Sequence, residues 1–178
     1  DRGEWESAEA LLKESLPFWK ASKYTFYLAQ CLLMQGRMQL GSGRIDEALA
    51  TLQDAKAKMI QIGAAGEVPE VDARIALCLV HQRKGGEALD IVADLLRKAE
   101  ASRSVAKLAS LIERVRALAL LSLGRVEEAR AAAGSSLAAA RARADRFETA
   151  LSLRALAEID RASGAAPATE IVRESESL

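Results

Sequence analysis

The sequence predicts an all-α protein, in which about nine helices stack as antiparallel pairs. Apolar residues recur at three- and four-residue steps over most of the chain, which is the period of an amphipathic helix. Between these stretches a helix-to-helix seam recurs, best seen in Gly124-Arg-Val-Glu-Glu-Ala129. A glycine there ends one helix, and acidic residues with a small alanine open the next. Aligned on the alanine, the five copies lie about 40 residues apart, at Ala8, Ala48, Ala88, Ala129 and Thr169.

Composition narrows the classes of function. The chain has 178 residues, with 25 basic and 25 acidic side chains, so no global field favours nucleic acid or an anionic membrane as a partner. No apolar stretch approaches the length of a membrane span. The two cysteines, Cys31 and Cys78, form neither a disulfide framework nor a metal-binding spacing, and we expect a reducing, cytoplasmic compartment.

The first element expected is a helix over residues 4–16, ended or kinked by Pro17. In the repeat register it is the second helix of a pair, and Asp1 to Gly3 would be the tail of a missing first helix. It therefore has no partner on its N-terminal side. We expect the natural polypeptide to extend upstream.

Aromatic residues gather at the same end of the chain. Six of the seven fall within the first 27 residues, namely Trp5, Phe18, Trp19, Tyr24, Phe26 and Tyr27. One interpretation is a cap, in which the rings close the open end of the core. The other is a docking surface for an upstream repeat or domain, since exposed large aromatics mark interfaces.

Four helix pairs follow, and we expect all of residues 1–178 to form one repeat domain. Glycines at the seams and prolines in first turns mark the helix ends. Gly41-Ser-Gly43, Gly85-Gly86 and Gly124 are such breaks, while Pro69 and Pro167 open helices. The predicted pairs span residues 22–62, 68–101, 104–142 and 146–178.

With this register, the repeats resemble tetratricopeptide repeats of an extended type. Twelve residues before each seam position, where that family needs a small residue, stand Gly36, Ala76, Ala117 and Ala157. The family's second small position holds Ser15, Ala55, Leu95 and Ser136, which is a partial match. The period of about 40 exceeds the usual 34 residues, and the consensus Trp and Tyr are missing. The resemblance implies a right-handed superhelix whose first helices line a concave surface.

Extended repeats of this composition resemble the sensor arrays of large bacterial signalling proteins, such as LuxR-type ATP-dependent transcription activators and multidomain nucleotide cyclases. The phrase Ser-Leu-Gly-Arg-Val-Glu-Glu-Ala-Arg is typical of them. The resemblance implies a non-catalytic regulatory region that binds a protein or ligand. The alternative is a free-standing adaptor or co-chaperone.

No catalytic set is visible, so we expect neither an enzyme nor a cofactor or metal site. The single histidine, His81, lies three residues after Cys78, but zinc requires further ligands and none has matching spacing. Gly36 and Gly41 have the spacing of two phosphate-loop glycines, but Ser42 and Gly43 follow where Lys and Ser or Thr are required. His81 is expected at the edge of the inner groove instead.

If the first helices line a groove, each of four successive helices contributes one arginine to it. These are Arg37, Arg74, Arg114 and Arg154, joined at the groove edge by His81. Such a ladder suits an acidic peptide in extended or helical form. The alternative is that the arginines only solvate the inner face or pair with Glu70, Glu113 and Glu158.

Overall fold

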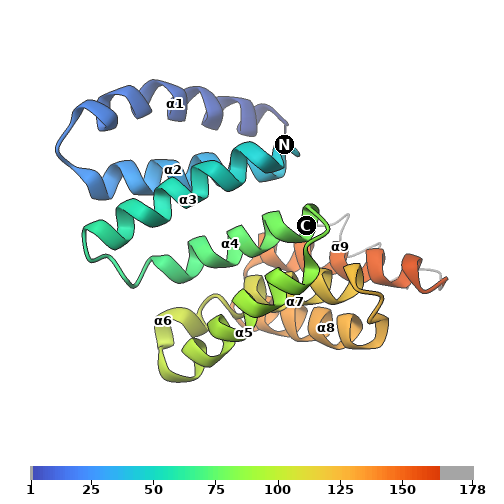
Figure 1. Ribbon diagram of the computed structural model, residues 1–178. Helices are drawn as coiled ribbons and strands as arrows, with labels where there is room; N and C mark the ends of the chain where they lie inside the picture. Colours follow the sequence, from blue (N-terminus) through green and yellow to red (C-terminus); the bar gives the residue numbers. More distant parts are fainter. Residues whose placement is uncertain (1, 165–178) are drawn as a thin grey trace. The chain divides into compact units, whose positions relative to one another are not determined.

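The computed structural model describes the backbone of residues 2–164, and the side chains of residue 7 and residues 10–164 (Figure 1). Across these residues the chain is helical, without strands, which confirms the predicted all-α class. The helix expected to begin at Pro167 lies outside the described residues. The helices are α1 Arg2–Ala21, α2 Thr25–Gly41, α3 Ile45–Gln61, α4 Val68–His81, α5 Gly85–Ala101, α6 Arg103–Ala106, α7 Ala109–Ser122, α8 Val126–Ala142 and α9 Arg146–Ala162.

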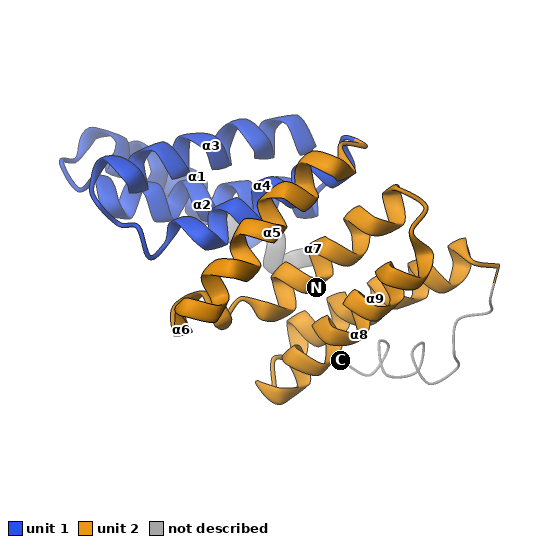
Figure 2. Ribbon diagram, turned by 60° about the horizontal axis from the view of Figure 1, so that its bottom comes forward, with its two compact units in different colours: residues 1–82 blue, residues 83–178 orange. Residues whose placement is uncertain are grey.

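The chain divides into two units, residues 1–82 and residues 83–178 (Figure 2). Unit 1 holds α1 to α4 and unit 2 holds α5 to α9. The boundary falls inside the predicted pair 68–101. The single repeat domain over residues 1–178 therefore stays a prediction, and each unit is described by itself.

In unit 1 each helix packs on the next one along the chain, α1 on α2, α2 on α3 and α3 on α4. Leu16, Leu32 and Ala55 bring α1, α2 and α3 into one buried apolar cluster. Leu52 and Met59 on α3 are fully buried. Each buried leucine or methionine contributes about 1.5–3 kcal/mol to the free energy of unfolding, so these contacts hold the unit together.

The first helix was predicted to end at residue 16. Instead, α1 continues through Pro17 to Ala21. A proline inside a helix removes one hydrogen bond, to the carbonyl four residues earlier, which here belongs to Lys13. Lys13 is exposed, so water can take the place of the missing donor. Burial of Leu16 against α2 favours continuing the helix past that point.

Unit 2 is built around α7, which packs against α5, α8 and α9. Its buried cluster consists mostly of alanines with Leu120 and Ile159, so the helices approach closely. The helix expected from residue 104 is broken, because a turn at residues 107–108 separates α6 from α7. There the Leu108 N–H bonds to the carbonyl of Val105, three residues back, instead of four. Helix α8 ends at Ala142, the predicted end of the pair 104–142, and α9 begins at Arg146, the predicted start of the pair 146–178.

At the predicted seams a helix ends at a residue whose backbone has the left-handed conformation. At Gly124 the backbone φ is 74°, and the Arg125 N–H reaches back to the carbonyl of Leu120 at 3.0 Å. This is the Schellman arrangement, which favours glycine because it needs a positive φ. Gly43 and Gly164 have the same conformation, with φ of 77° and 75°. The first copy differs, since Gly3 lies inside α1 instead of at a helix end.

Arg83 stands where the other four copies have glycine, and it takes the same left-handed conformation as three of those glycines, with φ of 63°. An L-residue with a side chain pays about 1–2 kcal/mol for that conformation. We therefore expect Arg83→Gly to raise the free energy of unfolding by about 0.5–1 kcal/mol, after the entropy cost of glycine. Urea denaturation followed by circular dichroism measures this change. Lys84→Gly is the control, because Lys84 has an ordinary φ of −100°, and that substitution should give no gain.

The small residues at the repeat positions lie where helices meet. Ala48, Ala88 and Ala129 at the seams are fully buried, as are Ala76 and Ala117 at the first small position. At Gly36 a Cβ atom would lie 2.6 Å from Cγ of Leu52, across the α2–α3 contact. Glycine there permits a helix approach that alanine would obstruct.

Candidate interaction surface

Five aromatic side chains contact one another where α1 ends and α2 begins. This aromatic cluster consists of Phe18, Trp19, Tyr24, Phe26 and Tyr27. Trp19 and Tyr27 stack with ring centroids 4.9 Å apart, and Phe18 meets Trp19 edge-on at the same distance. Tyr24 and Phe26 both meet Tyr27 edge-on, at 6.3 and 5.8 Å. Tyr27 thus joins both helices into one apolar surface.

The aromatic cluster is exposed to a degree unusual for large rings. Phe18 and Tyr24 are each 65% exposed, Tyr27 52% and Phe26 41%. Rings that cap a core would be buried, yet here Leu16 is the buried residue at this end of α1. Exposed, contiguous aromatics are typical of protein interfaces, where such side chains provide much of the binding energy. The geometry favours the docking alternative. The side chain of Trp5 lies outside the described residues.

The two predicted groove arginines of unit 1 converge on one carboxylate. Arg74 donates two hydrogen bonds to Glu70, at 2.8 and 3.1 Å, and Nη1 of Arg37 lies 3.9 Å from the same oxygen. The side chain of Arg74 is only 11% exposed. The alternative to a binding groove was that the arginines pair with acids such as Glu70. That pairing is present for Arg74.

Arg114 of unit 2 is buried, with 5% exposure, and forms an ion pair with Glu148 at 3.1 Å. The Glu148 N–H in turn donates to Asp145, the residue that caps α9, at 3.0 Å. The pair therefore ties α7 to the first turn of α9. The acids predicted as partners of the arginines, Glu70, Glu113 and Glu158, do not include Glu148, which lies 34 residues from Arg114. Because Arg114 is buried and paired, we leave it out of the candidate surface.

The two remaining groove residues are exposed. His81 is the last residue of α4 in unit 1, and Arg154 lies on α9 in unit 2. Arg37, Arg74 and His81 therefore belong to one unit, and Arg114 and Arg154 to the other. A single ladder formed by all of them stays a prediction.

Cys78 and His81 do not share an environment, although they are one turn apart. Cys78 is fully buried, and burial raises the pKa of its thiol to about 11, so it stays protonated at neutral pH. His81 is exposed. A cysteine nucleophile reacts as the thiolate, and Cys78 is protonated at neutral pH. Among the side chains that the structure describes, those of residue 7 and residues 10–164, no three histidine, cysteine or acidic residues form a group that could hold a metal ion.

None of the described helices combines the length and the apolar character that a membrane span requires. Comparison with known proteins gives no family: no family model matches the chain, and no curated protein is significantly similar to it.

Proposed function

We propose that this chain is a non-catalytic scaffold for protein–protein interaction in the cytoplasm, and that it is the regulatory repeat region of a larger bacterial signalling or transcription-regulatory protein. The observation that carries the proposal is the aromatic cluster, in which four rings are between 41% and 65% exposed. The occupant of this surface is a neighbouring helical repeat or domain of the same larger protein.

The chemistry of the surface supports this role. Tyr and Trp combine a large apolar face with one polar group, and they lose little conformational entropy when they become buried in an interface. Phe18, Trp19 and Tyr27 already contact one another, so part of that entropy cost is met before a partner binds. A preorganised surface of this kind suits a protein partner.

The repeat pattern supports the proposal that the chain is the repeat region of a larger regulatory protein. Seam positions about 40 residues apart, with buried alanines at Ala48, Ala88 and Ala129, are what a stack of similar helix pairs requires. The resemblance to bacterial sensor arrays rests on this period and on the alanine- and arginine-rich composition.

The natural reading frame that contains these residues tests the assignment. We expect it to encode an ATPase, cyclase or DNA-binding segment on the same polypeptide, and mass spectrometry of the purified natural protein should give the correspondingly larger mass. A reading frame that encodes helical repeats with a capping helix at each end, and nothing else, would contradict it and favour an adaptor or co-chaperone.

A further inference from the structure

Unpaired positive charge in unit 1 gathers at the aromatic cluster. The lysines and arginines of residues 10–82 fall into two groups. One group forms ion pairs with acids of the same unit and consists of Arg37, Arg44, Lys56, Lys58 and Arg74. The other group is exposed, pairs with none of the described side chains, and consists of Lys13, Lys20 and Lys23. The second group is confined to the end of the unit that carries the rings.

Two of these lysines lie directly beside aromatic residues. Lys20 follows Trp19 in the last turn of α1, and Lys23 precedes Tyr24 in the turn between α1 and α2. Ser22 fixes this turn, because its hydroxyl donates to the carbonyl of Trp19 at 2.9 Å and accepts from the N–H of Tyr24 at 3.2 Å. Consecutive Cα atoms are about 3.8 Å apart, so each ammonium lies within about one Debye length, roughly 8–10 Å, of the backbone of an aromatic residue.

The acidic residues of this segment do not balance the lysines. Glu14 is the one acid between residues 10 and 45, and the next acid, Asp46, follows the whole of α2. Over residues 10–31, three lysines against one acid leave a net charge of +2. An apolar centre with a polar rim is the usual arrangement of a protein interface, and charges of the rim select a partner of opposite sign.

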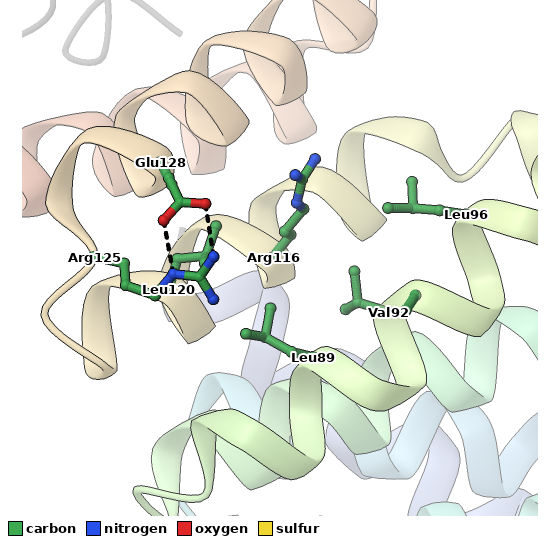
Figure 3. Close-up of a pocket in the computed structure, with 8 residues that line it drawn as sticks. Leu89, Val92, Leu96, Arg116, Leu120, Arg125 and Glu128 are labelled. Atoms are coloured by element: carbon green, nitrogen blue, oxygen red, sulfur yellow. Dashed lines mark hydrogen bonds and ion pairs between the residues drawn. The ribbon is translucent and has the colours of Figure 1, made fainter.

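The hollow between α5 and the start of α8 in unit 2 differs from this surface. Arg125 faces Glu128 there and donates two hydrogen bonds to it (Figure 3). Arg116 pairs with Glu113 at 3.4 Å, and Val92 in the wall is only 1% exposed. The hollow therefore combines a buried wall with arginines that already have acids, whereas the aromatic cluster combines exposed rings with unpaired lysines.

We propose that the surface covering the aromatic cluster is acidic: the neighbouring repeat or domain places Asp or Glu side chains against Lys20 and Lys23, around an apolar centre that packs on the rings. This inference rests on the proposed function and adds the charge of the partner. An anionic membrane also attracts aromatic and basic side chains. Three lysines are too few for it, because such binding uses clusters of about 4–8 Lys or Arg.

Photo-crosslinking in the natural full-length protein tests the charge of the partner. Benzoylphenylalanine replaces Tyr24, and the yield of the crosslink to a protein segment outside residues 1–178 is measured. We expect Lys20→Glu with Lys23→Glu to lower this yield about fivefold, because like charges then face each other. Raising the salt concentration should lower the yield without any substitution at the lysines, since salt screens exposed charges.

A charge exchange and a matched control complete the experiment. Mass spectrometry identifies the crosslinked segment, and replacing its two nearest acids by lysine should restore the yield in Lys20→Glu with Lys23→Glu. The control is Lys84→Glu with Lys107→Glu in unit 2, where both lysines are also exposed and pair with none of the described side chains. It changes the net charge equally and should leave the yield unchanged. Circular dichroism should show the same helicity for both double variants.

An undiminished yield in Lys20→Glu with Lys23→Glu, or a yield that salt leaves unchanged, would overturn the acidic partner. The cluster would then remain a protein interface, and the proposed function would stand. No protein crosslink from position 24 at all would count against the proposed function itself. If, in addition, the chain binds phosphatidylserine vesicles and Lys20→Glu with Lys23→Glu abolishes that binding, the cluster is a membrane surface and both proposals fail.

Discussion

Gly36→Ala is expected to lower the free energy of unfolding by about 1–3 kcal/mol. The added Cβ atom would lie 2.6 Å from Cγ and 2.7 Å from Cδ2 of Leu52, far inside van der Waals contact. Leu52 is fully buried, so its side chain has no free space into which it can turn. Either α2 and α3 move apart or Leu52 leaves its preferred rotamer. Urea denaturation of the two proteins measures the difference.

The same substitution at Gly134 should act in the opposite direction. Gly134 lies inside α8, where an added Cβ meets no atom within 4 Å. Alanine there removes the entropy cost of a helical glycine and should stabilise the protein by about 0.5–1 kcal/mol. If both substitutions change stability by the same amount and sign, helix propensity dominates and the close α2–α3 approach is not a constraint.

The second large effect is expected at the buried ion pair of unit 2. Arg114→Met leaves the Glu148 carboxylate, whose side chain is 13% exposed, without its cation. Breaking a buried pair from one side costs about 3–5 kcal/mol, because the remaining charge is neither hydrated nor compensated. We expect a loss in that range for Arg114→Met and for Glu148→Gln. The double variant should lose less stability than the sum of the two single losses, because it leaves no unpaired buried charge.

An exposed pair of the same chemistry provides the control. Arg125 and Glu128 are joined by two short hydrogen bonds, which lower the pKa of the Glu128 carboxyl and raise that of Arg125, but their side chains are 48% and 55% exposed. Water and salt screen such a pair, so Arg125→Met should not change stability measurably. A loss as large as that of Arg114→Met would show that burial is not the cause.

Local features of the fold could be predicted from the sequence because they depend on residues close together in the chain. Gly124 marks a helix end because the left-handed turn needs a glycine, and α8 and α9 follow from helical periodicity between such ends. The passage of α1 through Pro17 could not be predicted, because packing of Leu16 against α2 outweighs a local signal. The break at residues 107–108 could not be predicted either, because neither residue is a glycine or a proline.

The candidate site was predictable only in part, for the same reason. The concentration of aromatics at one end is visible in the sequence, but their exposure depends on how α1 and α2 pack. The partner of Arg114 illustrates the limit most directly. Periodicity places Arg114 on one face of α7, but it does not state which residue of α9 lies opposite, and Glu148 was therefore missed.

Site-specific photo-crosslinking in the natural full-length protein tests most directly whether the aromatic cluster is an interaction surface. Benzoylphenylalanine replaces Tyr24 in the cluster or, as the control, Gln53 on the exposed side of α3. We predict that position 24 crosslinks to a protein segment outside residues 1–178, identified by mass spectrometry, and that position 53 does not. Equal crosslinking at both positions, or none from position 24, would contradict the account.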